Sequence, residues 1–540
     1  MSINRRLCVF LFLFVGSFLL SSCGGGSSRP PQPTNYSIGG TVSKLAGSGG
    51  GLQLQNNGGD TLSVNANGTF TFTTKVASGS RYNVTVSAQP STPAQTCGVT
   101  GGSGTATANV TNITVDCGHN EWTWVNGANV VSQPGVYGTQ GTPALGNVPG
   151  ARAIAASWTD TSGNLWLFGG GGRDSAGADG ALNDLWKYSG GEWTWMSGAN
   201  VINQTGTYGT QGTPAPGNVP GARMGPVSWI DASGNPWLFG GQGFDSAGSS
   251  GFLNDLWKYS GGEWTWMSGA NVINQAGTYG TQGTPAPGNV PGSRLFSLSW
   301  TDAAGDLWLF GGLGYDSAGS QGMLNDLWKY SGGEWTWMSG ANVINQAGTY
   351  GTQGTPAPGN APGARTGALG WTDSSGNLWL FGGGGYDSTG SWGYLNDLWK
   401  YSGGEWTWMS GANVRNQAAS YGTLGTPAPG NDPGSRYIAV AWTDATGDFW
   451  LFGGYGLSGK LNDLWKYSGG QWAWMSGPNV VNQAGTYGTQ GTPAPGNVPG
   501  ARVQSLTWAD ASGNLWLFGG YGIDSAGNVE SMNDLWAFEP

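Results

Sequence analysis

The sequence predicts an all-β protein that consists mainly of one repeated unit, and two observations support this prediction. The first is composition: among 540 residues there are 103 Gly, 27 Pro and 31 Trp. Gly and Pro disfavour long helices, whereas so many Trp side chains are untypical of a disordered polymer. The second is repetition, because Leu-Phe-Gly-Gly and Asn-Asp-Leu-Trp each occur six times. We therefore expect many short strands joined by turns.

The charge of the chain argues against one class of partner. Only 9% of the residues are charged, and the formal net charge is -10. A protein that binds nucleic acid usually presents a basic surface, which this composition lacks. We therefore expect no nucleic-acid partner.

The N-terminus has the features of an export signal. Arg5 and Arg6 precede an apolar run that is short for a bilayer span, and this pattern predicts a signal peptide over residues 1–22. Leu20-Ser21-Ser22-Cys23 then resembles the lipobox of bacterial lipoproteins, a resemblance which implies that Cys23 carries lipid. The alternative is an uncleaved anchor helix. Gly24 follows the cysteine where an Asp would resemble an inner-membrane signal, so the resemblance favours the outer membrane. Residues 23–35, rich in Gly, Ser and Pro, are predicted to form a flexible tether.

Residues 36–118 are predicted to form a small β-sandwich. Apolar and polar residues alternate in short runs such as Thr69-Phe70-Thr71-Phe72, with turn-forming residues between the runs. The segment resembles the Ig-like or transthyretin-like modules of bacterial surface proteins, and a spacer role is preferred. Cys97 and Cys117 are expected to form a disulfide in an exported protein. A metal site is the weaker alternative because His119 is the only histidine.

Residues 119–540 contain the repeats. Glu-Trp-Thr-Trp begins at Glu121 and recurs every 71 residues until Glu405, and its variant at Gln471 follows after 66. The first unit contains four predicted strands, at 154–159, 165–168, 182–188 and 193–196. The hairpins at 160–164 and 189–191 are tight, whereas the links at 169–181 and 197–223 are long. Four-stranded antiparallel sheets repeated radially form a β-propeller.

Several motifs of the unit resemble the kelch repeat. These are the Gly-Gly after the second strand, the spaced aromatic residues Tyr188 and Trp195, and Pro-Gly-Ala-Arg before the first strand. The resemblance implies a kelch-type β-propeller like the central domain of galactose oxidase, here with six blades. The last unit lacks a fourth strand, so we expect residues 121–125 to supply it and to close the ring. One Trp in each of the first three strands of a unit and two in the fourth account for 30 of the 31; Trp392 is the exception.

The propeller lacks the side chains that several enzyme classes require. It contains no Cys and at most His119 at its edge, which argues against the copper chemistry of galactose oxidase, hydrolase triads and zinc sites. The hairpin from Thr159 to Trp166 loosely resembles the Asp-box of sialidases, although a motif repeated in every blade is better explained as a turn device. The sequence therefore predicts no catalytic residue and no metal ligand.

Two series of aspartates recur in the repeats. Those of the third strands are expected to bond to blade turns; they are Asp184, Asp255, Asp326, Asp397, Asp463 and Asp534. Those of the loops after the second strand are Asp174, Asp245, Asp316, Asp387 and Asp524. Calcium is conceivable at the loop series, but each loop offers too few oxygen ligands for a recognised calcium site, so no cofactor is assigned.

One arginine precedes the innermost strand of each blade. A ring of six guanidinium groups near the channel mouth could attract an anionic ligand. The alternative is that each arginine bonds to loop carbonyls and stacks on a Trp. The six residues are Arg152, Arg223, Arg294, Arg365, Arg436 and Arg502.

The face that carries the long links is the expected working face. Positions near the second-to-third link vary between blades: matched positions carry Arg173, Ile523 or Ala181 in some units and aromatic residues in others. Variable aromatic residues suit recognition of a sugar or a protein, and the alternative is that they pack the loops. The candidate ligand-binding residues are Phe244, Phe252, Tyr315, Tyr386, Trp392 and Tyr394.

Together these observations suggest a monomeric, lipid-anchored protein of the bacterial cell envelope that binds a glycan or a protein. It would contact the membrane only through its N-terminal lipid. Two alternatives remain: a carbohydrate-active enzyme that resembles periplasmic sialic-acid mutarotases, or a purely structural envelope protein. A nonrepeated Arg–carboxylate pair in the channel would favour the enzyme, and a continuous aromatic patch would favour binding.

Overall fold

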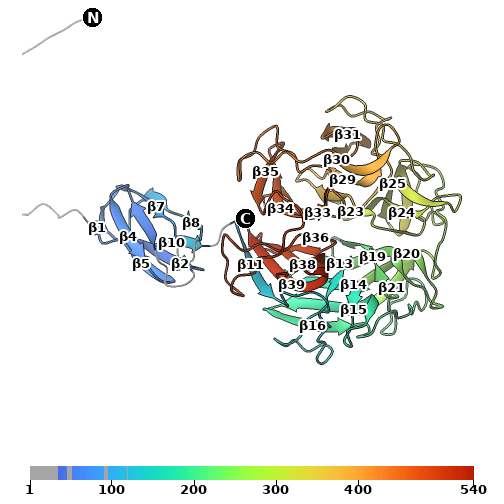
Figure 1. Cartoon of the computed structure of the whole chain (residues 1–540), viewed down its shortest axis with the longest axis horizontal. Coiled ribbons are helices and arrows are strands. Elements are labelled where there is room, and N and C mark those ends of the chain that lie inside the picture. Colours follow the sequence, from blue (N-terminus) through green and yellow to red (C-terminus); the bar gives the residue numbers. More distant parts are fainter. Residues whose placement is uncertain (1–33, 46–50, 91–94, 118–119, 445) are drawn as a thin grey trace, which may run out of the picture.

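The computed structural model describes residues 34–540, except 46–50, 91–94, 118–119 and 445. The described residues form strands, turns and loops without a helix, so this part of the chain contains no helix able to cross a membrane. The predicted signal peptide, Cys23 and most of the predicted tether lie outside the described residues. A small unit, blue in Figure 1, lies beside a large ring of sheets.

The small unit contains two four-stranded sheets that share one hydrophobic core. Its strands are β1 (Asn35–Tyr36), β2 (Ile38–Ser43), β3 (Leu52–Asn56), β4 (Asp60–Val64), β5 (Gly68–Thr71), β6 (Val76–Ala77), β7 (Arg81–Ala88), β8 (Cys97–Thr100), β9 (Ser103–Thr105) and β10 (Val110–Cys117). One sheet has the order β5-β2-β10-β8 and the other β4-β3-β7-β9. Alternation places Leu52 and Leu54 in the core and exposes Gln53 between them. Cys97 and Cys117 lie opposite each other on β8 and β10 and form a disulfide.

The ring contains six antiparallel sheets, five of them with five strands and one with four. The strands that begin and end the series are β11 (Glu121–Asn126), β36 (Arg502–Val503), β37 (Leu506–Ala509), β38 (Leu515–Ile523) and β39 (Val529–Glu539). The next two sheets contain β12 (Arg152–Ala153), β13 (Ala156–Thr159), β14 (Leu165–Arg173), β15 (Asp179–Ser189) and β16 (Glu192–Ser197), then β17 (Arg223–Met224), β18 (Val227–Ile230), β19 (Pro236–Phe244), β20 (Ser250–Ser260) and β21 (Glu263–Ser268).

The remaining sheets follow the same plan. They contain β22 (Arg294–Leu295), β23 (Leu298–Thr301), β24 (Leu307–Tyr315), β25 (Gln321–Ser331) and β26 (Glu334–Ser339), then β27 (Arg365–Thr366), β28 (Leu369–Thr372), β29 (Leu378–Tyr386), β30 (Trp392–Ser402) and β31 (Glu405–Ser410), and finally β32 (Val440–Thr443), β33 (Phe449–Tyr455), β34 (Lys460–Ser468) and β35 (Gln471–Ser476). In each five-stranded sheet two short strands, such as β12 and β13, pair with one longer strand. Only β13 lies within the first strand predicted at 154–159, and β12 precedes it.

The second strand of each repeat is longer than the sequence predicts. β14 continues through Gly169 and Gly170 to Arg173, with a shift of register between Phe168 and Gly170. Both glycines have positive φ, 66° and 94°, so they form a bulge within the strand instead of ending it. The long loop predicted at 169–181 is therefore wrong, and only residues 174–178 connect β14 to β15. The variable aromatic residues consequently lie on or near paired strand ends.

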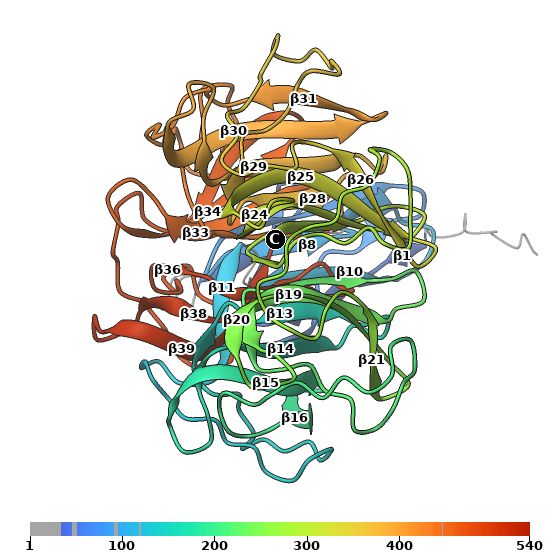
Figure 2. The ribbon, with the colours of Figure 1, turned by 90° about the vertical axis from the view of Figure 1, so that its right-hand side faces the viewer.

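The six sheets close into a ring through their innermost strands. β13, β18, β23, β28, β32 and β37 contact one another in a complete cycle. Beside these strands a cycle of backbone hydrogen bonds runs from each repeat to the one before it, with N···O distances between 2.8 and 3.2 Å. Its six members all have positive φ; they are Ile154, Gly225, Phe296, Gly367, Ile438 and Gln504. This arrangement is consistent with a β-propeller and is seen from two directions in Figures 1 and 2.

The sheet that contains the last strand of the chain also contains β11. Trp122 of β11 lies opposite Phe538 of β39, and their ring centroids are 5.1 Å apart. Trp122 is fully buried and also contacts Phe452 of the preceding sheet at 5.3 Å. Two segments more than 400 residues apart in the sequence therefore share one sheet.

Aromatic side chains fill the spaces between neighbouring sheets. Phe168 of β14 packs edge-on against Trp264 of β21, with ring centroids 5.3 Å apart. The same contact recurs one sheet further on, between Phe239 and Trp335, at 5.5 Å. Trp side chains thus provide the apolar surface that the many glycines lack.

Candidate functional site

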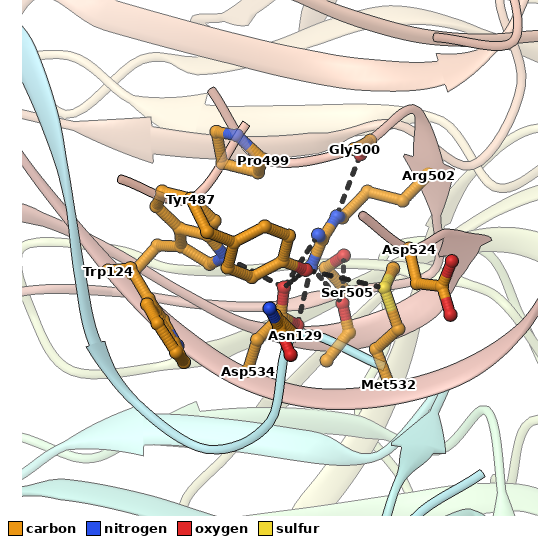
Figure 3. A network of polar contacts seen from close by, with 12 residues as sticks. Trp124, Asn129, Tyr487, Pro499, Gly500, Arg502, Ser505, Asp524, Met532 and Asp534 are labelled. Atoms are coloured by element: carbon orange, nitrogen blue, oxygen red, sulfur yellow. Dashed lines mark hydrogen bonds and ion pairs between the residues drawn. The ribbon is translucent and has the colours of Figure 1, made fainter. Parts of the chain in front are cut away.

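A network of buried polar groups recurs in every sheet, and Figure 3 shows it in the last one. The guanidinium of Arg502 donates to both carboxylate oxygens of Asp534, each at 2.8 Å. Its Nε atom donates to the carbonyl oxygen of Gly500, and Nη1 donates to the carbonyl oxygen of Gly519 as well as to Asp534. Tyr487 Oη and Trp536 Nε1 donate to the same carboxylate at 2.6 and 2.7 Å. Almost all donors and acceptors of this network are therefore used within the protein.

The guanidinium groups do not form an exposed ring at the channel mouth, so the predicted anion site is wrong. Each is at most 1% exposed and pairs with the third-strand aspartate of its own repeat; this holds for Arg152, Arg223, Arg294, Arg365, Arg436 and Arg502. Burial lowers the pKa of Arg502, but the charge and hydrogen bonds of Asp534 and Tyr487 together outweigh it, so the pKa is raised and the group stays charged. The third-strand aspartates bind these arginines instead of bonding to turns.

The aspartate in the hairpin that resembles an Asp-box organises its own turn. Asp160 Oδ1 accepts hydrogen bonds from the backbone N–H groups of Ser162 and Asn164, both at 2.9 Å. Asp160 Oδ2 accepts from Trp166 Nε1 at 2.8 Å. In the next repeat burial raises the pKa of Asp231, but hydrogen bonds from Trp237 and Asn235 outweigh it and lower the pKa to about 2. These contacts are typical of a structural turn.

The loop aspartates, which the sequence offered for calcium, bind backbone N–H groups. Asp174 Oδ1 accepts from Ala176 and Ala178, both at 2.9 Å, and Oδ2 accepts from Ile202 in the link to the next sheet at 3.3 Å. Donors that occupy both oxygens leave little room for a cation. Within the described part of the chain, no three His, Cys, Asp or Glu side chains gather in a way that could hold a metal.

The six aromatic candidates fall into different environments. Phe252 is buried and contacts Tyr315 edge-on at 6.0 Å, so these two pack against each other across neighbouring sheets. Phe244 and Tyr386 are half-buried. Trp392, in contrast, is 51% exposed and contacts Tyr394 at 6.0 Å. The structure thus brings only some of the candidates together.

Trp392 and Tyr394 belong to a larger aromatic cluster between the fourth and fifth repeats. Tyr394 stacks on Tyr437, with ring centroids 5.9 Å apart, and meets Tyr455 edge-on at 6.1 Å. Beside them is a cavity of about 450 Å³. We call this site the aromatic groove; the cavity is lined by Trp392, Gly393, Tyr394, Arg415, Asn416 and Leu457.

A shortened hairpin opens the aromatic groove. β33 and β34 have seven and nine residues, whereas β29 and β30 have nine and eleven. The fifth sheet therefore ends two residue pairs earlier than the fourth, beside the terminal pair of Tyr386 and Trp392. Leu457, in the short connection, is 46% exposed. In the sequence, this deletion is visible because the repeat spacing falls from 71 to 66 residues.

Sequence reasoning missed five side chains of this site: Tyr437, Tyr455, Arg415, Asn416 and Leu457. A signal for one of them was present, because Arg415 occupies the position of Ile202, Ile273 and Ile344 in other repeats. Its side chain is exposed. Tyr437 and Tyr455 could not be connected with Trp392 without knowing how far the fifth hairpin extends.

A second cavity, of about 400 Å³, lies where the first, second and last repeats meet. We call it the axial hollow. Small residues of the first sheet, Ala153, Gly171 and Ala181, form one wall, and Met224 and Tyr521 lie on others. The lining also includes Phe244, one of the six aromatic candidates, and the carboxylates of Asp179 and Glu530. The channel inside the hydrogen-bond cycle holds a smaller cavity of about 170 Å³, whose described lining contains no charged side chain. The Arg–carboxylate pair that would favour an enzyme does not occur there.

No family model matches the chain, and no curated protein matches it. The chain is similar to a solved structure described as "Structure of YjhT", with a TM-score of 0.43 and 13% sequence identity, over 73% of this chain and 96% of the other.

Proposed function

We propose that the protein is a lipid-anchored component of the bacterial cell envelope that binds a glycan through the aromatic groove. In this proposal residues 1–22 are a signal peptide, Cys23 carries the lipid, and residues 23–35 are a tether. Residues 36–118 form an Ig-like or transthyretin-like spacer, and residues 119–540 form a six-bladed kelch-type propeller. The observation that carries the binding function is the nonrepeated, exposed cluster around Trp392.

Several properties of the groove support a sugar ligand. Sugar rings present apolar C–H faces that stack on aromatic rings, and Trp392, Tyr394 and Tyr455 offer such rings at one site. Asn416 and Arg415 add polar groups at the cavity wall, which suit the hydroxyl groups of a sugar. The repeats are otherwise nearly identical but differ at the aromatic groove. The fold itself does not require an aromatic residue at the position of Trp392.

A glycan array with the full chain in detergent tests this proposal. Wild type should bind at least one glycan, and Trp392→Ala should weaken that binding tenfold or more while the melting temperature stays within about 2 °C, because exposed substitutions usually change stability by no more than about 0.5 kcal/mol. Leu145→Ala is the matched control, since Leu145 is 79% exposed and lies outside the groove. Binding that survives Trp392→Ala would remove the groove from the proposal. Capture of a protein but of no glycan would favour a protein ligand.

A further inference from the structure

We infer that the ligand of the aromatic groove is a linear acidic oligosaccharide, bound lengthwise along a track from Trp392 to Tyr521 in the last sheet. This inference rests on the proposed function, and it adds the chemical class and the extent of the ligand. Two observations carry it: aromatic side chains that follow one another from the fourth repeat to the last, and two cations that have no carboxylate within 4 Å among the described residues.

The track is continuous from one repeat to the next. It begins with Trp392 and Tyr394 and passes to Tyr455 through a ring contact of 6.1 Å. Lys460 lies opposite Tyr455 in the short hairpin of the fifth sheet. The Nζ atom of Lys460 lies 4.8 Å from the ring centroid of Tyr521, in the last sheet. The track ends at Tyr521, because the axial hollow beyond it is lined by the carboxylates of Asp179 and Glu530, which would repel an acidic ligand.

The two cations of the track, Arg415 and Lys460, differ from most other cations of the ring because they have no carboxylate partner among the described residues. Every inner arginine pairs with a carboxylate, and four lysines, including Lys187 and Lys258, lie within 4.0 Å of a hairpin aspartate. Among the described residues no carboxylate lies within 4 Å of Arg415 or Lys460. Burial also lowers the pKa of Lys460, and no carboxylate within 4 Å opposes this effect.

Both cations stand where other repeats carry uncharged residues. Arg415 occupies the position of Ile202 and Ile273, and Lys460 occupies that of Ala181 and Phe252. Neither position needs a charge for the fold, because the other repeats form the same sheet without one. A guanidinium binds a carboxylate or sulfate with two parallel hydrogen bonds, and an ammonium binds either as a point charge. In a chain of net charge -10, these groups give one site that is complementary to an anion.

The separation of the cations argues for a chain of sugars over a single sugar. Arg415 lies in the link that follows the fourth sheet, and Lys460 begins β34 of the fifth sheet. Aromatic rings lie between them and continue on the far side of Lys460 to Tyr521. A chain with an acidic group on successive sugars would meet both cations while its apolar faces stack on the rings between them. The acidic group is a carboxylate or a sulfate.

Calorimetric titration of the full chain in detergent tests the inference with defined probes. The probes are a galacturonic acid hexamer, the same hexamer with its carboxyl groups reduced to alcohols, the monomer, and a heparin hexasaccharide as the sulfated source. We expect one of the acidic hexamers to bind at least tenfold more tightly than the neutral hexamer and the monomer. Arg415→Ile and Lys460→Met should each reduce this preference at least threefold. Lys75→Met, which removes an exposed lysine of the small unit, is the matched charge control.

The outcomes separate this inference from the proposed function. Equal affinity for acidic and neutral hexamers would overturn the acidic class, and equal affinity for monomer and hexamer would overturn the extended track. If no hexamer binds, but the array finds a glycan whose binding needs Trp392, the inference is wrong and the proposed function stands. If the folded protein binds no glycan in either experiment, both are wrong.

Discussion

Each sheet of the ring buries one guanidinium and one carboxylate away from solvent. Removing two charges from water is unfavourable, and the gain from their attraction depends on complete hydrogen bonding. Here the tyrosine and tryptophan that donate to the same carboxylate supply that bonding, as Tyr350 and Trp399 do for Asp397. The network therefore fixes how the link before a sheet, its first strand and its third strand lie together.

We predict that Arg365→Met destabilises the folded chain by about 3–5 kcal/mol, because it leaves the carboxylate of Asp397 buried without its partner. The double variant Arg365→Met, Asp397→Leu should recover part of this loss. Arg173→Met is the control, since Arg173 is half-buried and donates only to one carbonyl in its own loop. Chemical denaturation measures the three variants. A loss below about 1 kcal/mol for the single variant would contradict the role assigned to the network.

The sequence could identify these arginines and aspartates as recurrent but could not pair them. Arg152 and Asp184 are 32 residues apart, and they meet only because β12 and β15 flank the same long strand. The same reason explains the failed anion site, because the burial of a guanidinium depends on how tightly neighbouring repeats pack. Trp392 was predictable because it alone departs from the Trp pattern of the repeats.

At the scale of strands, the alternation of residues predicts where sheets form better than where strands end. The hairpins at 160–164 and 189–191 follow directly from their Asp, Ser and Gly residues. The Gly-Gly that was expected to follow the second strand, however, forms a bulge within that strand and does not end it. Whether glycine ends a strand depends on its neighbours across the sheet, which the local sequence does not specify.

Strand β11 carries an acidic group in an unusual place. Glu121 is 3% exposed because the small unit covers it, and its Oε1 accepts a hydrogen bond from the backbone N–H of Thr96 at 2.7 Å. Its counterpart Glu192 is half-buried. Burial raises the pKa of Glu121 to about 7, although the bond from Thr96 opposes this.

We predict that Glu121 makes stability depend on pH. Its pKa in the unfolded chain is about 4.3, below the folded value, so the folded chain binds the proton more tightly. Stability should therefore fall as pH rises from about 4.3 to 7, and Glu121→Gln should remove this part of the decrease. The melting temperatures of both proteins at pH 5 and pH 8.5 measure this effect. Relative to wild type, the melting temperature of the variant should be higher at pH 8.5 than at pH 5. The control Glu192→Gln should behave as wild type does, and a constant difference between wild type and Glu121→Gln would contradict the prediction.

At the scale of the whole molecule, the small unit comes between the predicted lipidation site and the ring in the order of the chain. Lys44 of the small unit forms an ion pair with Glu539 of the last strand, and Thr96 contacts Glu121. The small unit therefore rests on the sheet in which β11 and β39 pair. This placement suits a spacer that holds the ring away from a membrane.

We predict that Cys23→Ser moves the protein from the membrane fraction to the soluble fraction or leaves it unprocessed, because the lipid would be attached to the cysteine sulfur. Fractionation of cells, followed by mass determination of the N-terminal peptide, measures both effects. The serine substitution at Cys97 is the control, since it removes the disulfide and leaves the lipobox intact. A Cys23→Ser protein that is processed normally and stays in the membrane would contradict lipid anchoring.

Because of the shortened fifth hairpin, we expect the chain to bind one ligand. A ring of equal repeats offers any ligand as many equivalent positions as it has repeats, and a ligand would then distribute among them. The loss of five residues in one hairpin breaks that rotational symmetry and makes one junction between sheets unlike the others. The repeated fold thereby acquires one distinct binding site. We expect a titration to saturate at one ligand per chain.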